Sequence, residues 1–470
     1  MVWSDPLSAA SDAHDGAATT PHVLADRVED ALARHADAPR IVPVTVPVEP
    51  VDPLQWLQAQ SEDRRFYWSG RRDGVAVAAV GTADTVGDAT AVDLPAVATR
   101  LATRFNQMAA PTRYVGGMQF DMQPVADRPD SPWSDFQAVH FVLPRLELRV
   151  ESGDAATLTC NLVLPRDRKR AAALRQQIEA LRWPVPSVPM DLPLPVDRTD
   201  APSRDEWLAM IEKALAAIDR DALKKVVLAR QSTVMLDAPL DPVTLLRHLQ
   251  PATPGCFHYL MQPAAEAAFV GASPERLLRQ EGRQLWTEAI AGTRSRGDSA
   301  RADAALRDEL LASEKDRREH AFVQAAIRDA LAPISSVIDG NGKLSELKLA
   351  RGRHLQSRLQ AHLHESITPI DVLDVLHPTP AVGGVPTRAA VQAIREYEPF
   401  DRGWYAGPVG WVGPNAAEFA VAIRSGLVRD RQLSLFSGAG IVDGSVPAKE
   451  WDEIEQKIGD FMAVLSLDRV

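Results

Sequence analysis

The sequence is poor in cysteine, has no long apolar run and shows no basic stripe. Its two cysteines, Cys160 and Cys256, are too few for a disulfide framework, so we expect a reducing, cytoplasmic setting. No CxxC pair or Cys/His cluster indicates structural zinc. No stretch approaches the apolar length that spans a bilayer, and the first 20 residues carry aspartates where a signal peptide needs an apolar core. We therefore expect no membrane partner.

The charge is acidic and evenly spread. The chain has 52 Lys and Arg against 63 Asp and Glu, a net charge of −11, and the two signs are interspersed. A nucleic-acid partner is excluded because such proteins concentrate basic residues on one face. An anionic substrate would need a local positive site made by a few Arg and Lys residues and a metal ion, because the global field is negative.

What is present is enough apolar sequence for a large core, since 45% of the 470 residues are hydrophobic. Residues 1–40 predict a variable lead-in with a short helix at 23–35. Residues 41–183 alternate as strands do, with helical patches at 94–108 and 166–181. Residues 184–202 are rich in proline and predict an extended connection. Ser203 and Glu206 then form a capping box that opens the next helix.

The second half, residues 203–470, mixes strands and helices without a βαβ rhythm. Segments such as "KKVVLARQSTVML" and "QLSLFSGAGIV" predict strands, residues 300–331 predict one long helix, and a last helix is expected from about Ala448. This mixture favours an α+β fold with large, mostly antiparallel sheets.

Eight short segments of this half carry chemistry: "KVVLAR", "GASPERLL", "AIAGTRSRG", "SEKDRREH", "HPTPAVGG", "AIRSG", "SGAGIV" and "KEWDEIEQK". Each alone is a weak signal. Together and in this order they resemble the chorismate-utilising enzymes, which include isochorismate synthases, salicylate synthases and the large components of anthranilate and aminodeoxychorismate synthases. The resemblance covers residues 203–470, which it identifies as a chorismate-binding catalytic region.

The resemblance implies a Mg²⁺ cofactor held by two glutamates. Glu319, before the histidine of "SEKDRREH", matches the first metal-ligating Glu of the family, and Glu453 in "KEWDE" matches the second. Mg²⁺ prefers carboxylate oxygens and keeps several waters. A ligand shifted by one helical turn stays open, which leaves Glu314 and Glu450 as alternatives.

The resemblance also implies an acid–base pair. Water must attack ring carbon 2 of chorismate while the hydroxyl on carbon 4 leaves, so one group deprotonates and another protonates. Lys225 matches the general base of the family and Glu275 the general acid, with Lys224 as the other possible register for the base. A lysine acts as a base only when its pKa is lowered, and a carboxyl acts as an acid only when its pKa is raised.

The second carboxylate of chorismate requires positively charged side chains that bind it. Arg424 and Lys457 match the contacts of the family to the pyruvyl carboxylate. Further matches that imply substrate contact are Tyr405, His354 and the glycines Gly292 and Gly438, which would let backbone N–H groups approach the ligand.

Three positions indicate which family member is present. Ammonia-using members carry Gln where Lys225 stands, aminodeoxychorismate synthases carry a nucleophilic Lys at Ala291, and salicylate synthases usually carry Thr at Ala381. The residues found here favour an isochorismate synthase. A salicylate synthase and a non-catalytic chorismate-binding protein remain the alternatives.

The resemblance implies one compact body in which a large antiparallel β-sandwich is surrounded by helices, and both halves of the chain supply strands to it. We expect a monomer without an amidotransferase subunit, since no ammonia is used. The long N-terminal half favours menaquinone biosynthesis over siderophore biosynthesis.

Overall fold

The computed structural model describes residues 21–34, 39–71, 74–89, 92–122, 131–151, 155–185, 187–188, 190–339 and 343–466. Residues 1–20 and 35–38 of the predicted lead-in therefore lie outside the described residues. The helix predicted at 23–35 is confirmed as α1 (Pro21–Arg34), which buries one face made by Leu24, Val28 and Leu32. No helix of the described residues is long and apolar enough to cross a membrane.

One run of antiparallel strands forms the first layer of the structure. In hydrogen-bonding order it contains β7 (Pro195–Ala201), β8 (Lys225–Leu236), β20 (Gln432–Ile441), β19 (Ser425–Arg429), β10 (Ala267–Ser273), β9 (Phe257–Ala264), β2 (Arg65–Ser69), β3 (Ala76–Asp88) and β5 (Val139–Val150). A short strand, β16 (Gly384–Val385), pairs with the start of β8. Strand β2 of the first half lies between β3 and β9, so both halves of the chain build this layer.

A second run of antiparallel strands continues from the same β5. It contains β4 (Tyr114–Met118), β17 (Pro408–Val412), β18 (Ala416–Val421), β11 (Arg276–Glu281), β12 (Gln284–Ser295) and β15 (Gly352–Leu363), with β13 (Ser335–Asp339) and β14 (Ser345–Lys348) on β15. The branch β6 (Ala156–Leu164) and β1 (Arg40–Val48) also leaves β5.

Strand β5 joins the two layers. One of its edges pairs with β3 along its length, while the other edge is divided between β4 and β6. The predicted α+β class with large antiparallel sheets is confirmed. The two layers of the predicted sandwich are hydrogen-bonded to each other through β5 and make one continuous sheet that folds back on itself.

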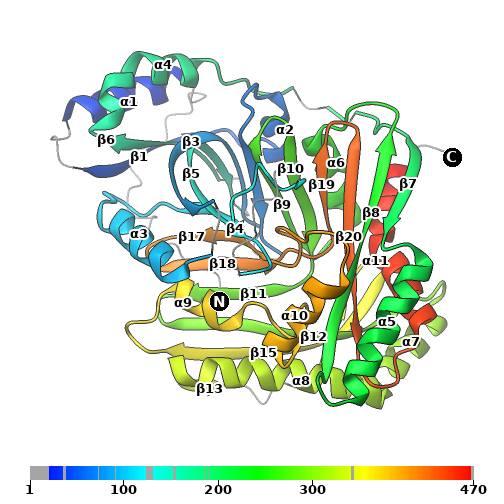
Figure 1. Cartoon of the computed structure of the whole chain (residues 1–470). Helices are drawn as coiled ribbons and strands as arrows, with labels where there is room; N and C mark the ends of the chain where they lie inside the picture. Colours follow the sequence, from blue (N-terminus) through cyan, green and yellow to red (C-terminus); the bar gives the residue numbers. More distant parts are fainter. Residues whose placement is uncertain are drawn as a thin grey trace.

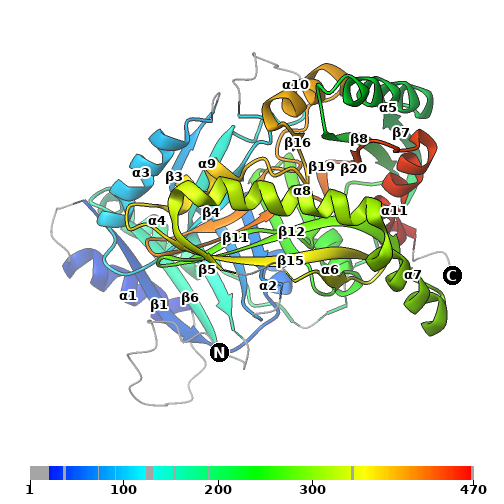
Figure 2. The same cartoon turned by 90° about the horizontal axis from the view of Figure 1, so that it is seen from below.

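Helices cover the outer faces of both layers, as Figures 1 and 2 show. They are α2 (Pro53–Ala59), α3 (Leu94–Asn106), α4 (Ala171–Glu179), α5 (Arg204–Asp219), α6 (Pro242–Ala252), α7 (Ala300–Ala312), α8 (Glu314–Leu331), α9 (Pro369–Leu376), α10 (Thr387–Tyr397) and α11 (Pro447–Ser466), with short 3₁₀ turns at Arg166–Arg170 and Ala332–Ile334. Helix α8 packs on β12 and β15, and α11 packs on β20.

The prediction of a single helix over residues 300–331 is wrong, because the structure has two helices there, α7 and α8. The chain leaves helical geometry at Ser313, which has φ −65° and ψ 114° and separates α7 from α8. Ser313 ends one helix and caps the next, because its side chain accepts a hydrogen bond from the backbone N–H of Asp316. This break sets the direction in which α8 presents its first two turns.

Candidate active site

One pocket gathers the residues that the sequence predicted as the site. It has a cavity volume of about 480 Å³ and is lined from β8, β12, β15, β20, α7, α8, α11 and the loops that follow β10, β18, α9 and α10. All eleven predicted site residues line it: Lys225, Glu275, Gly292, Glu319, His354, Ala381, Tyr405, Arg424, Gly438, Glu453 and Lys457. They come from segments up to 232 positions apart, since the first is 225 and the last 457.

Lys225 is the first residue of β8, and its side chain is 1% exposed. Its Nζ lies 2.9 Å from Oε1 of Glu319 on α8, so the predicted base and the predicted metal ligand form an ion pair. The neighbouring Lys224 is exposed and pairs with Asp221 on the surface. The strand register therefore turns Lys225, and not Lys224, into the pocket.

Gly440 on β20 allows this ion pair to form. A Cβ at this position would lie 2.7 Å from Oε1 of Glu319 and 3.2 Å from Cε of Lys225. Real Cβ atoms essentially never approach an oxygen so closely, so any other residue would displace the carboxylate. Gly440 belongs to the segment "SGAGIV", in which the sequence argument had selected only Gly438.

Glu275 lies in the turn between β10 and β11 and is buried. Its backbone N–H donates to Oγ of Ser273 at 3.2 Å, and its carbonyl accepts from the N–H of Val421, which fix the turn on both sides. Burial raises the pKa of the Glu275 carboxyl to about 8, and the Glu288 carboxylate adds to this rise, while the ammonium of Lys225 opposes it. A carboxyl with this pKa is protonated at neutral pH and is able to donate a proton.

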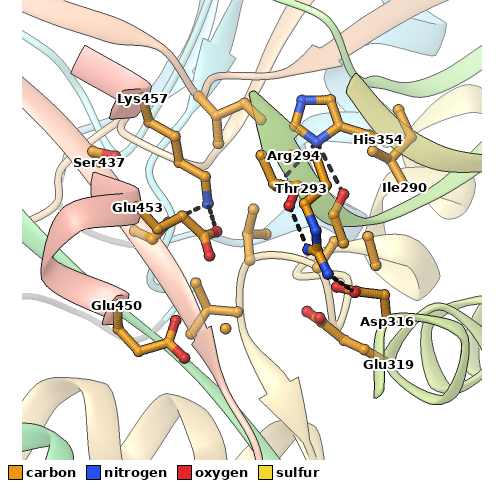
Figure 3. Close-up of a pocket in the computed structure, with 18 of the residues that line it drawn as sticks. Ile290, Thr293, Arg294, Asp316, Glu319, His354, Ser437, Glu450, Glu453 and Lys457 are labelled. Atoms are coloured by element: carbon orange, nitrogen blue, oxygen red, sulfur yellow. Dashed lines mark hydrogen bonds and ion pairs between the residues drawn. The ribbon is translucent and has the colours of Figure 1, made fainter. Parts of the chain in front are cut away.

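Acidic residues of two helices face the same space. Glu319 and Asp316 project from α8, and Glu450 and Glu453 project from α11 on the opposite side of the pocket (Figure 3). Burial and the neighbouring Glu453 carboxylate both raise the pKa of Glu450. Burial opposes ionisation of Glu453 as well, but the Lys457 ammonium, 2.7 Å away, brings its pKa below the usual value. Glu314, the other alternative ligand, does not line the pocket.

These carboxylates fit a hard divalent cation. Their donors are oxygens only, and the pKa of Glu450 is raised first by burial and then by the neighbouring Glu453 carboxylate, whose repulsion a bound cation would relieve. Within the described residues no group of three His, Cys, Asp or Glu side chains comes close enough to enclose a metal. A hard cation such as Mg²⁺ is bound through one or two carboxylates and completes its shell with water and substrate oxygens, so it requires fewer protein ligands than such a group supplies.

A cationic group lines the same pocket. Arg424 has φ 49° and donates from Nη1 to Asp460 on α11 at 2.7 Å. Its Nη2 lies 3.2 Å from Nε2 of His354, whose Nδ1 lies 3.2 Å from the carbonyl of Gly292. Burial and the charge of Arg424 lower the pKa of His354 to about 3, so the ring is neutral, donates to Gly292 and accepts from Arg424.

Lys457 and Tyr405 complete this side. Lys457 donates to the carbonyl of Gly438 at 2.8 Å and to Glu453, and its third N–H remains for a ligand. Tyr405 is buried and its ring stacks on Phe436 at 5.3 Å between centroids. A Cβ on Gly438 would lie 3.1 Å from the hydroxyl oxygen of Tyr405, so this glycine keeps the hydroxyl accessible.

Several pocket residues were not identified from the sequence. Asp316 binds Arg294 at 2.8 Å, and Gly292, with φ +71°, would bring a Cβ to 3.0 Å from Asp316. The spacing of Asp316 from Glu319 by three residues on one helix was a usable signal, because such residues share a face. Asp460, three residues after Lys457, carried the same signal on α11; it does not line the pocket but accepts from Arg424 at 2.7 Å.

The fold and the pocket together define a chorismate-utilising enzyme. The chain belongs to the chorismate binding enzyme family, whose model matches residues 26–466. Isochorismate synthase MenF of Pasteurella multocida is 33% identical over 89% of this chain and 91% of its own length. The salicylate biosynthesis isochorismate synthase of Pseudomonas aeruginosa is 33% identical over 95% of this chain and 94% of its own.

A solved structure agrees with these relatives. The structure of MenF, the menaquinone-specific isochorismate synthase of Escherichia coli, matches with a TM-score of 0.82 and 28% identity, over 94% of this chain and 99% of that one. The resemblance found from the eight segments is confirmed, and it extends across the N-terminal half. The chain is an isochorismate synthase-like, chorismate-utilising enzyme.

Proposed function

We propose that the protein converts chorismate to isochorismate, with water as the nucleophile. The observation that carries the proposal is a buried carboxyl, Glu275, whose pKa is raised to about 8 and which lines the same pocket as a buried lysine, Lys225. A hydroxyl exchange at neutral pH requires a group that donates a proton, which such a carboxyl does, and a group that accepts one, the role that the family resemblance gives to Lys225.

The proposed reaction divides between the two groups. Lys225 removes a proton from water as its oxygen bonds to ring carbon 2. The ring double bonds shift, and the bond between carbon 4 and its hydroxyl breaks. Glu275 gives its proton to that oxygen, which leaves as water, so one water enters and one departs. Both side chains are nearly inaccessible to solvent, which keeps their proton transfers on the substrate.

We propose Glu319 and Glu453 as the Mg²⁺ ligands, with Glu450 close enough to assist. The ion, when bound, supplies positive charge for the ring carboxylate of chorismate and for charge that develops in the transition state. Arg424 and Lys457 then hold the pyruvyl carboxylate. Support comes from the pocket, which is lined by both glutamates and by both cationic side chains.

Two small side chains favour isochorismate formation over the other reactions of the family. Ala291 lines the pocket where a covalent mechanism would need a nucleophilic lysine, and Ala381 lines it where salicylate-forming relatives usually carry threonine. These residues favour release of isochorismate before pyruvate is eliminated. Salicylate formation is the second candidate, because a salicylate biosynthesis relative matches almost the whole chain.

Product analysis tests the proposal. Purified protein with Mg²⁺ is expected to form isochorismate from chorismate, detected by coupling to isochorismatase, and no product when EDTA is present. Lys225→Ala and Glu275→Gln are each expected to lower kcat by roughly 10²–10⁴-fold, the usual contribution of a positioned acid or base. Salicylate and pyruvate formed as fast as isochorismate would establish the second candidate instead.

We also propose that the enzyme is a cytoplasmic monomer that serves menaquinone biosynthesis. The similarity to a menaquinone-specific enzyme along 94% of the chain supports this assignment. Deletion of the gene in its host is expected to deplete menaquinone and to spare catechol siderophores. Sedimentation is expected to give the mass of one 51.2 kDa chain.

A further inference from the structure

A buried ion pair lies directly behind the turn that carries Glu275. Arg71, just after β2, donates from Nη1 to Oε2 of Glu288 on β12 at 2.9 Å, and its Nη2 donates to Oε1 of the same carboxylate. Both side chains are 3% exposed. Gln356 on β15 also donates to Oε2 of Glu288 at 2.9 Å. Neither Arg71 nor Glu288 lines the pocket, so neither is in position to touch the substrate.

The same arginine holds the backbone next to Glu275. Nη1 of Arg71 donates to the carbonyl of Pro274 at 2.5 Å. One planar guanidinium therefore connects a carboxylate on β12 with the peptide immediately before Glu275. Arg71 belongs to the N-terminal half of the chain, from which the sequence argument had drawn no site residue.

A pair of this kind needs a reason other than stability. Removing two charges from water costs several kcal/mol per ion, and well-packed apolar residues often serve a fold equally well. The position of this pair supplies a reason, because Arg71 joins the Glu288 carboxylate to the peptide that immediately precedes Glu275.

We propose that Arg71 and Glu288 are positioning residues for the reaction: Arg71 fixes the turn that carries Glu275, and Glu288 keeps a negative charge behind that carboxyl so that it stays protonated. The inference rests on the proposed role of Glu275 as general acid.

The charged groups around Glu275 give the sign of the effect. Burial raises the pKa of Glu275 most, and Glu288 on β12 raises it further. Lys225 on β8, Lys457 on α11 and Arg71 each lower it. An acid catalyst loses activity as pH rises through its pKa, so the basic limb of the profile follows Glu275. Removing the charge of Glu288 lowers that pKa and moves the basic limb to lower pH.

Glu288→Gln is the decisive variant because glutamine has nearly the same shape and no charge. We expect the basic limb of kcat/KM to move down by about one pH unit, which gives about tenfold less activity above the limb and little change well below it. Arg71→Lys keeps the charge but not the planar fork, so kcat is expected to fall while the limb stays in place.

Asp167→Asn is the matched control. Asp167 forms an equally buried pair with Arg145, 2.6 Å apart, in the N-terminal half, and it does not act on Glu275. This variant is expected to lose thermal stability without a change in the pH profile.

An unchanged limb in Glu288→Gln, or an equal loss of activity at every pH, would overturn the inference and leave the proposed function intact. If Glu288→Gln does not fold, Arg71→Lys decides: unchanged kcat overturns the inference, and reduced kcat with an unmoved limb supports it. Turnover that survives in Glu275→Gln removes the proposed general acid, and the inference falls with it.

Discussion

At the scale of the residue, the cations of the pocket are held by carboxylates. Lys225 pairs with Glu319, Lys457 with Glu453 and Arg424 with Asp460. Each pair joins a group proposed to act on substrate to a carboxylate that is proposed to hold Mg²⁺ or that fixes the position of its partner. Binding of substrate or metal must therefore compete with these three ion pairs. A small displacement of one side chain of a pair is expected to shift the position of the other.

Gly440→Ala tests this coupling. The added methyl would meet Oε1 of Glu319 at 2.7 Å, so the carboxylate has to move. We expect kcat/KM to fall by roughly 100-fold, since a shift of about 1 Å in a catalytic group has effects of this size, and the Mg²⁺ requirement to rise. The measurement is initial rate against Mg²⁺ concentration.

Gly459→Ala on α11 is the control for that substitution. A Cβ at Gly459 meets nothing within 4 Å, and alanine is the better helix former. The variant is expected to keep its activity and to gain about 0.5–1 kcal/mol of unfolding free energy. If Gly440→Ala kept wild-type kinetics, the close approach at this position would have no functional meaning.

The sequence was sufficient to predict nine of the eleven pocket residues from eight ordered motifs, while His354 and Tyr405 were matched to the family outside those motifs. It was insufficient to predict Arg71 and Glu288, because neither residue lies within one of those motifs. Arg71 meets Glu288 only after β2 and β12, 217 positions apart, are brought together by the sheet. Contacts of this kind depend on the topology of the sheet, so they cannot be predicted from the local patterns of a single sequence.

At the scale of the element, α8 and α11 carry the acidic residues of the pocket and lie on opposite sides of it (Figure 3). Local signals predicted the starts of two helices well: Ser203 with Glu206 opens α5, and the helix expected from about Ala448 begins at Pro447. The break at Ser313 was missed because "LLASEKD" has good helix formers on both sides. In the structure Ser313 takes extended backbone geometry and caps α8, on which Asp316 and Glu319 face the pocket.

Ser313→Ala is expected to lower stability by about 1 kcal/mol, the usual cost of a lost N-cap, and to raise the Mg²⁺ concentration needed for half-maximal rate. The reason is that Asp316, whose N–H the cap accepts at 3.3 Å, and Glu319 lie in the first two turns of α8. Denaturant unfolding and metal titration of the rate measure the two effects.

Asp93→Ala removes the equivalent cap of α3, whose side chain accepts from the N–H of Ala96 at 2.9 Å. It is expected to cost similar stability and to leave the metal dependence unchanged. Equal metal dependence in both cap variants would show that the start of α8 does not orient the ligands.

At the scale of the whole molecule, neutral histidines are built into the interior. His258 lies between β2 and α6, where it contacts Ser69 and Thr253, and His377 donates to the carbonyl of Phe120. Burial lowers the pKa of both residues to about 4 from 6.5. Below pH 6.5 these two histidines bind protons in the unfolded chain but not in the folded chain. The free energy of unfolding therefore decreases as pH falls toward 4.

We expect each of these histidines to cost about 1 kcal/mol of stability between pH 7 and pH 5.5. His377→Gln keeps an N–H donor and is expected to flatten the dependence by that amount, while His364→Gln, at an exposed site, leaves it unchanged. Urea unfolding at a series of pH values measures both. An unaltered slope in His377→Gln would exclude this residue as a source of acid sensitivity.

The exposed stretch between the halves has a practical consequence. Val185 and Val188 are 83% and 86% exposed, whereas β2–β9 and β4–β17 hold the two halves together through interior strand pairs. A chain cut in this stretch would yield two fragments that each display unpaired strand edges and that complete each other only on reassembly. Because Arg71 and Glu275 would then sit on different fragments, recovered turnover would report that assembly directly, as in a split-enzyme sensor.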